Sequence, residues 1–166
     1  MLRVLTSIAI AALVVILDQS SKRVIWELYK YSGGAEVIDG FFRFTLSKNR
    51  GAVFGILSNA GHLLLVIRII SIGVPAFFAY RMRYAPTHKR VCLGLILGGA
   101  FGNLIDHLAA GEVLDFLDVG IGMHRWPTFN VADIAVTVGA LLLILGYALH
   151  PDLNPKEHEP PLREQS

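Results

Sequence analysis

Four long apolar segments constrain the fold of this chain more than any other feature of its sequence. Crossing a bilayer as a helix takes roughly 20 mostly apolar residues, and residues 4–25, 61–80, 91–110 and 129–149 are all of about that length. The 166 residues are 54% hydrophobic and 17% charged, which is more apolar than is usual for a soluble domain. We therefore predict a membrane α-helical protein in which residues 1–150 form one four-span domain.

The distribution of basic residues predicts the orientation of these spans. The loop over residues 81–90 contains several arginine and lysine residues and no acid, so the positive-inside rule places it in the cytoplasm. Both termini are then cytoplasmic as well, including a charged, proline-rich and disordered tail over residues 151–166. The first apolar segment is followed by Asp-Gln-Ser-Ser-Lys and not by a small-residue cleavage site, and we interpret it as a retained span.

Two connections, residues 26–60 and 111–128, then face outward. Within the first, residues 42–47 alternate apolar and polar side chains, as a half-buried strand does. Residues 24–31 mix aromatic side chains with charges, a composition typical of interfacial segments. The sequence thus predicts four transmembrane helices with a small strand-containing extracytoplasmic cap.

Composition disfavours several classes of function. The net charge is only +2 and the basic residues do not alternate with aromatic ones, so nucleic acid is not an expected partner. The six histidines lack metal-ligand spacing and nothing resembles a phosphate loop, so we predict neither a metal nor a cofactor. The single cysteine, Cys92, cannot form an intramolecular disulfide and suits a small apolar role.

Polar residues that an apolar chain should avoid gather at one end of the predicted spans. They are Asp18, Asn103, Asp106, Asn130 and Asp133 at span edges, and Asp115 in the last connection. Alternating spans place all of them on the outer side, and carboxylates beside a lipid core are costly enough to indicate a functional site. Asp115 and Asp133 are candidates for an acid/base pair, because two close carboxylates share a proton and can activate water and then protonate a leaving amine.

The first two polar motifs also have structural interpretations. Asp18 and Lys22 are at i,i+4 with the acid first, the better orientation for a helical ion pair. They either form such a pair or brace a site and hold a lipid headgroup. Ser21 and Lys22 point about 100° apart on a helix, which argues against a serine–lysine protease. The segment Asn49-Arg-Gly-Ala-Val-Phe-Gly is either an ordinary re-entering loop or a backbone whose glycines approach a ligand closely.

The motifs of the last two spans are ambiguous in the same way. Asn103 and Asp106 share one helix face, which should look into the bundle whether it serves helix packing or a site. Asn130 followed by Asp133 resembles an N-terminal capping arrangement, and an acid in the first turn suits the helix dipole. Capping and function are equally supported for Asn130 and are compatible, whereas the neighbouring acids favour function for Asp133.

Taken in order, these motifs resemble those of lipoprotein signal peptidase, also called signal peptidase II. The matches are DQxxK from Asp18, NxGAxFG from Asn49, GGxxGNxxD ending at Asp106, VxDF around Asp115 and FNxAD ending at Asp133. Each motif is weak alone, but five in family order across nearly the whole membrane domain are specific. The resemblance implies a bacterial inner-membrane aspartyl protease that cleaves diacylglyceryl-modified prolipoproteins just before the lipidated cysteine. Membrane phospholipid is an implied partner, and globomycin-type compounds are candidate inhibitors.

Carried over residue by residue, the resemblance assigns catalysis to Asp115 and Asp133. The positions that it implies support the pair or hold substrate are Asp18, Lys22, Asn49, Gly51, Asn103, Asp106 and Asn130. One position departs from the family, which usually has arginine where this chain has His107. Arginine is permanently charged and histidine is mostly neutral near pH 7, so the arginine's implied substrate contact and the inhibitor sensitivity do not carry over directly.

Two other classes of function are compatible with the residues. A small four-span proton- or cation-coupled transporter also carries intramembrane acids, although these usually lie near the middle of a span and the loops are short. A membrane chaperone or assembly subunit would tolerate isosteric replacement of the aspartates. Arg68, inside the second span, fits none of these readings.

Overall fold

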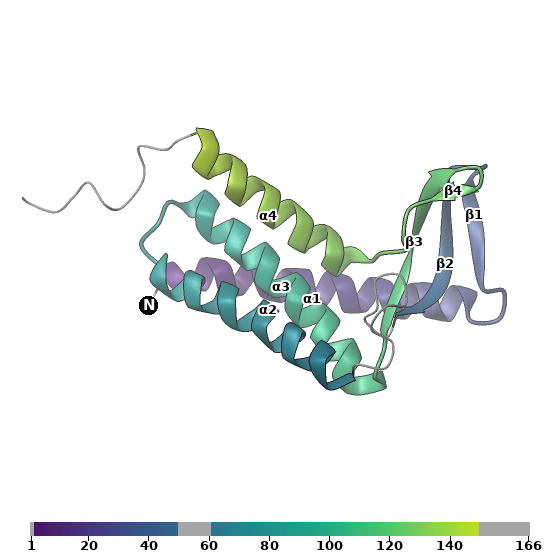
Figure 1. The fold of residues 1–166 in the computed structure, drawn as a ribbon, viewed down its shortest axis with the longest axis horizontal. Coiled ribbons are helices and arrows are strands. Elements are labelled where there is room, and N and C mark those ends of the chain that lie inside the picture. The colour runs from purple at the N-terminus through teal and green to yellow at the C-terminus, as the bar shows by residue number, and fades with distance from the viewer. Residues whose placement is uncertain (1, 50–60, 150–166) are drawn as a thin grey trace, which may run out of the picture.

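The computed structural model describes residues 2–49 and 61–149 of the chain. In these ranges the helices α1 (Leu2–Tyr29), α2 (Gly61–Arg81), α3 (Thr87–Ala110) and α4 (Val131–Leu149) lie side by side in a bundle. The strands β1 (Gly34–Ile38), β2 (Phe42–Asn49), β3 (Val113–Ile121) and β4 (His124–Arg125) form a sheet at one end of the bundle (Figure 1). The turn between α2 and α3 lies at the opposite end (Figure 1).

All four apolar segments that the sequence predicts are helical. The bounds of α2, α3 and α4 agree with the prediction to within a few residues, and α1 continues beyond residue 25. By length and apolar composition, two helices in the described part of the chain could cross a membrane, Val4–Tyr29 and Thr87–Ala110, and Val131–Gly146 is a shorter apolar helix.

Helix α3 lies at the centre of the bundle, where it contacts α1, α2 and α4. Glycines make these contacts close. A Cβ atom at Gly98 would lie 2.8 Å from the carbonyl oxygen of Ala11 on α1, and one at Gly102 would lie 2.6 Å from a carboxylate oxygen of Asp18. The small residues on this helix thus permit close packing at both positions.

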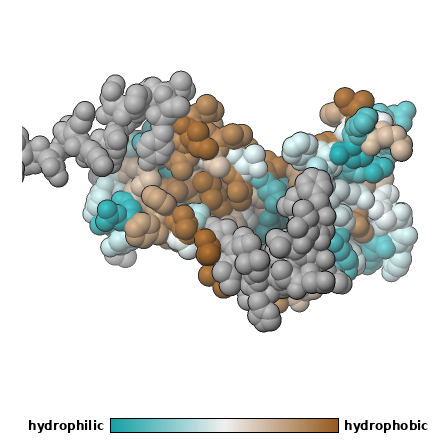
Figure 2. All heavy atoms as spheres, viewed as in Figure 1, coloured by the Kyte–Doolittle hydropathy of each residue, from teal (hydrophilic) through white to brown (hydrophobic). Residues whose placement is uncertain are grey.

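The outward faces of the helices are apolar. Large hydrophobic side chains are exposed on every helix, among them Leu13, Phe77, Phe101, Leu141 and Ile144, and Figure 2 shows a hydrophobic surface over the helical part of the molecule. Contiguous apolar surface of this extent marks contact with a membrane or a partner. The bundle therefore buries few side chains of its own and presents an apolar exterior.

The sheet is antiparallel, with the strands in the order β1-β2-β3-β4. The strand predicted over residues 42–47 is confirmed as part of β2. No local pattern predicts β3, because Asp115 and Asp118 interrupt its apolar alternation. It forms because β2 pairs along it, with Ser47 opposite Asp115, and because two arginines neutralise Asp118. The buried Asp118 carboxylate pairs with Arg43 of β2 and, at 2.9 Å, with Arg125 of β4.

The segment predicted as interfacial, residues 24–31, mostly belongs to α1. Contacts with the sheet account for the extra length of this helix. The Tyr29 ring stacks on Phe44 of β2 with centroids 5.9 Å apart, and the Lys48 ammonium lies 5.5 Å from the centroid of the Trp26 ring. Such non-local contacts leave no periodic signal in the sequence.

Candidate active site

Backbone pairing between β3 and the segment before α4 brings the two motifs with central aspartates together. Leu117 donates its N–H to the carbonyl of Phe129 at 2.8 Å, and Phe129 donates to the carbonyl of Leu117 at 3.1 Å. Asn130, the residue that follows, thereby lies beside Asp115. Its side-chain amide donates to Asp115 Oδ1 at 2.7 Å, and Asn130 itself is fully buried.

Asp115 is a buried carboxylate held from two sides. Besides the Asn130 contact, its Oδ2 accepts a hydrogen bond of 3.0 Å from Asn49 Nδ2 at the end of β2. Burial raises the pKa of Asp115 to about 6; the Asn49 hydrogen bond opposes this, and the negative charge of Asp133 adds to it. A carboxyl group tuned in this way exchanges protons close to neutral pH, as acid/base chemistry requires.

Asp133 is fixed by the start of α4. The N–H of Asp133 donates to Asn130 Oδ1 at 3.1 Å, and the N–H of Asn130 donates to Asp133 Oδ2 at 3.0 Å. This reciprocal pair is a capping box, so the capping interpretation is confirmed. The Asn130 side-chain oxygen caps the helix while its amide donates to Asp115.

Asn103 of α3 connects the two carboxylates to the other helices. Its Nδ2 donates to Asp133 Oδ1 at 2.8 Å, and its Oδ1 accepts from Asn130 at 3.1 Å and from Lys22 Nζ at 3.3 Å. Asn103 thus contacts both residues of the cap at the start of α4. The predicted inward face of α3 is confirmed, because the neighbouring Asp106 also turns toward α1.

Lys22 is a buried cation between two carboxylates. Its Nζ lies 2.7 Å from Asp18 Oδ2 and 2.8 Å from Asp106 Oδ2, so the predicted i,i+4 ion pair is confirmed and extended to α3. The other oxygen of Asp18 accepts the N–H of Ala132 at 3.0 Å in the first turn of α4, where a negative charge also suits the dipole. Asp18 thereby ties α1 to the helix that carries Asp133.

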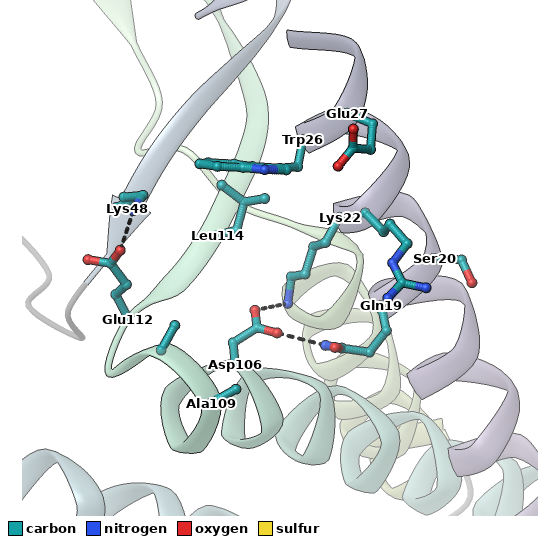
Figure 3. Close-up of a pocket in the computed structure, with 12 residues that line it drawn as sticks. Gln19, Ser20, Lys22, Trp26, Glu27, Lys48, Asp106, Ala109, Glu112 and Leu114 are labelled. Carbon is teal, nitrogen blue, oxygen red and sulfur yellow. Dashed lines mark hydrogen bonds and ion pairs between the residues drawn. The ribbon is translucent and has the colours of Figure 1, made fainter. Parts of the chain in front are cut away.

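Gln19 is a member of this network that the sequence analysis did not single out. Its side-chain amide donates to Asp106 Oδ1 at 2.8 Å (Figure 3) and also to the Gly102 carbonyl at 3.2 Å. The available signal was its position inside the DQxxK motif. Ser21 donates to the backbone carbonyl of Asp18 at 2.8 Å, which fits the argument against a serine–lysine pair.

Asp115 and Asp133 line one cavity of about 400 Å³. Asn49 and Asn103 share the cavity with them, and its remaining walls are Ile96, Ala100, Val113, Val136 and Thr137. Sequence reasoning missed these wall residues, because helical periodicity does not show which apolar side chains border a polar pocket. Two carboxylates in a mostly apolar cavity can hold a water molecule, share a proton and act on a bond between them.

A second cavity, of about 610 Å³, is lined by Lys22 and Asp106 among others (Figure 3). Trp26 and Leu114 form part of its wall. Several of its charged residues form ion pairs, since Lys48 lies 2.6 Å from Glu112 and Glu27 contacts Lys30. Neither Asp115 nor Asp133 lines it, so the smaller cavity is the candidate active site.

Of the three remaining residues singled out in the sequence, the structure describes only His107 in full. Gly51 is outside the described residues, as is the side chain of Arg68. His107 is in the last turn of α3, where its carbonyl accepts the N–H of Gly111 at 2.9 Å, and it lines neither of the two cavities. In the described part of the chain no group of three His, Cys, Asp or Glu residues could hold a metal ion.

Over most of its length the chain is similar to known proteins. The sequence model of a family described as Signal peptidase (SPase) II matches residues 10–149. A lipoprotein signal peptidase of Syntrophus aciditrophicus (strain SB) is 39% identical over 140 residues, covering 81% of this chain and 87% of that protein. Another, from Janthinobacterium sp. (strain Marseille), is 42% identical over 140 residues, covering 82% and 84%.

A solved structure described as a bacterial membrane enzyme has the same fold, with a TM-score of 0.77 and 36% sequence identity over 93% of both chains. A second structure with that description gives a TM-score of 0.74 and 38% identity, covering 85% of this chain and 91% of the other. The match of the family model and the identity to these relatives extend over most of the chain. The chain belongs to the signal peptidase II family.

Proposed function

We propose that this protein is a lipoprotein signal peptidase, an aspartic endopeptidase that removes signal peptides from diacylglyceryl-modified prolipoproteins by cutting before the lipidated cysteine. The observation that carries the proposal is the shared cavity of Asp115 and Asp133 in a chain of the signal peptidase II family. Family membership also favours this function over a proton-coupled transporter or an assembly subunit.

In the proposed mechanism the two carboxylates begin with one proton between them. The ionised carboxylate removes a proton from water as the water oxygen attacks the scissile carbonyl carbon, and the protonated one donates to the carbonyl oxygen. When the tetrahedral intermediate collapses, the C–N bond breaks and the leaving amine takes the proton of one carboxyl group. The other, ionised carboxylate takes a proton from a hydroxyl group of the intermediate as the C=O bond reforms. The dyad then again holds one proton, so no covalent intermediate and no metal is required.

The surrounding residues have positioning roles in this proposal. Asn49 and Asn130 hold Asp115, and Asn103 holds Asp133. Asp18, Lys22 and Asp106 fix α1 and α3 beneath the pair. Gly51 and His107 are proposed to contact substrate from the neighbouring segments, with a weaker anion contact at His107 than the family's usual arginine provides.

The membrane setting is part of the same proposal. Residues 1–150 would cross the bacterial inner membrane four times with both termini and the tail over 151–166 in the cytoplasm, as the basic loop over residues 81–90 suggests. The sheet and the cavity then face outward, at the level of a substrate whose diacylglyceryl group lies in the outer leaflet. Phospholipid would surround the apolar helix faces, and globomycin-type compounds would compete at the cavity.

Cleavage of a defined substrate tests the proposal. Purified full-length protein in detergent is incubated with a diacylglyceryl-modified prolipoprotein and, separately, with the unmodified precursor, with a chelator present throughout. We expect the modified substrate alone to be cut, with a product that begins at the lipidated cysteine by mass spectrometry. Folded protein that cuts neither substrate would contradict the proposal, and so would activity that is lost when the chelator is added. If neither substrate is cut, proton flux in proteoliposomes would favour the transporter.

A further inference from the structure

Two neighbouring turns at one end of the sheet carry large apolar side chains into solvent. The turn between β1 and β2 and the turn between β3 and β4 lie side by side, because Gly122 donates to the carbonyl of Gly40 at 3.2 Å and Gly120 donates to that of Phe41 at 2.9 Å. We call the exposed apolar residues here the sheet tip: Ile38, Phe41, Ile121, Met123 and Trp126.

The fold does not account for these side chains. Turns of this kind favour Gly, Asn and Asp, and the backbone needs only Gly40 and Gly122, whose φ angles are 65° and 56°. Met123 is 95% exposed, Ile121 78% and Trp126 68%. An exposed apolar group of this size marks a contact surface.

The sheet tip is also held rigidly. Arg125 donates to the Gly40 carbonyl at 3.4 Å and to the Asp118 carbonyl at 3.0 Å, and its Nε pairs with the buried Asp118 carboxylate. These contacts join the two turns to the middle of the sheet. The apolar side chains of the sheet tip therefore have fixed positions relative to the sheet.

The position of the tip indicates what it contacts. The sheet crosses the end of the bundle at an angle, and the tip projects to the side of the molecule on which α4 lies (Figure 1). α4 exposes Ile134, Val138 and Leu142, and Figure 2 shows hydrophobic residues both over the helices and again at this end of the sheet. The tip thus lies beside the bundle, above the zone where lipid contacts α4.

From this continuity we infer that the sheet tip inserts into the surface of the lipid leaflet next to the active-site end of the bundle. Trp126, with its amphipathic ring, and the smaller apolar residues around it match the composition of membrane-interface contacts. This lipid contact would hold the end of the sheet that carries the tip, while α1 and α3 hold the opposite end of the sheet. It fixes the height of β3, and so of Asp115, above the lipid. This inference needs only the membrane setting of the family and does not depend on the two-aspartate chemistry.

Site-directed spin labelling tests the inference on the full-length protein in phospholipid nanodiscs. On a Cys92→Ala background, one label is placed by Met123→Cys and a second by Ile121→Cys, so that either reports if the other folds poorly. The matched control is Tyr31→Cys, because Tyr31 is 94% exposed and lies in the turn between α1 and β1, away from the tip (Figure 1).

We expect the two tip labels to be several-fold more accessible to oxygen, which partitions into lipid, than to a water-soluble nickel chelate, relative to the Tyr31→Cys label. Lipids carrying a shallow nitroxide should broaden the tip signals and leave the control signal unchanged. Equal access of the nickel chelate to tip and control would overturn the inference. The inference would also be overturned if the tip labels were protected from the nickel chelate without being broadened by the labelled lipid, and if this protection increased with the number of protein copies per nanodisc. A second copy of the chain would then cover the tip.

Discussion

At the scale of single residues, three asparagines decide how the two carboxylates are arranged. Each Asn side chain carries both donors and an acceptor, so it can hold a carboxylate in either protonation state on one side and a backbone or side-chain group on the other. Asn130 shows this most clearly, since its oxygen caps α4 and its amide holds Asp115. Replacing a carboxylate should therefore change how stability depends on pH, whereas replacing an asparagine should change activity and stability by different amounts.

The first prediction concerns the pH dependence of stability. Asp115 has a pKa of about 6 in the folded chain and about 3.9 when unfolded, so between these values the folded state holds the proton that the unfolded state has lost. The free energy of unfolding should then fall as pH rises from about 4 to about 6, by up to about 3 kcal/mol, and level off above.

Asp115→Asn removes this titration. The cost of any hydrogen bond that the new amide fails to make is the same at every pH, whereas wild type loses stability as the pH rises. The Tm of the variant relative to that of wild type should therefore rise between pH 4 and pH 7. Intrinsic tryptophan fluorescence on heating in detergent measures it. A difference in Tm that is constant across this range would show that Asp115 is not held protonated in the fold.

The second prediction separates the two roles of Asn130. Serine is as good an N-cap as asparagine but cannot donate to Asp115 and Asn103 as the amide does. Asn130→Ser should keep the cap, lose only the stability of the buried amide hydrogen bonds, and lower kcat about 10- to 100-fold, because the Asp115 carboxylate loses its 2.7 Å donor and its position. Asn130→Ala should lose the same activity and about 1 kcal/mol more stability than the serine variant, because it also removes the cap. Full activity in the serine variant would contradict this assignment.

At the scale of elements, the close packing of α1 against α3 determines where α4, and with it Asp133, lies. Asp18 is fully buried between Lys22 and the first turn of α4, and its carboxylate has room only because residue 102 lacks a side chain. The packing between α1, α3 and α4 thus depends on the absence of a single methyl group at residue 102.

The third prediction follows from that contact. In Gly102→Ala the new Cβ would lie 2.6 Å from Asp18 Oδ2, and overpacking of this kind costs typically 1–3 kcal/mol. We expect a lower Tm and lower activity together, because displacing Asp18 also moves the start of α4. The matched control is Gly73→Ala on α2, where a Cβ would have no atom within 4 Å and which should lose neither. Equal losses in the two variants would contradict the assignment of the sensitivity to the Asp18 contact.

At the scale of the whole molecule, hydropathy predicts the helices and the grouping of polar residues at one end of them, and the structure brings Asp18, Asn103, Asp106, Asn130 and Asp133 into one network. Those predictions succeed because an apolar segment of this length has few alternatives to a helix.

What the sequence does not predict depends on contacts between distant segments. β3 contains Asp115 and Asp118, whose charges hide its strand pattern until β2, Arg43 and Arg125 lie beside it. The added length of α1 depends on the ring contact of Tyr29 with Phe44. The apolar wall around the two carboxylates, including Ile96 and Val136, likewise appears only when α3, α4 and the sheet are packed together.

The whole molecule then acts as a support for one pair of groups. The bundle fixes Asp133 through α4 and Asn103, and the sheet fixes Asp115 through β3 and Asn49. Because the two carboxylates come from different parts of the fold, the account requires both of them and predicts that neither can replace the other.

The most direct test of this central claim is the cleavage rate of a diacylglyceryl-modified prolipoprotein by Asp115→Asn and Asp133→Asn, each compared with wild type and with Asp39→Asn, an exposed carboxylate in the turn between β1 and β2. Asparagine keeps the shape and removes the proton exchange. We predict that each of the first two variants folds and loses activity at least about 100-fold, and that Asp39→Asn cleaves like wild type. Near wild-type cleavage by either folded dyad variant would contradict the two-aspartate mechanism.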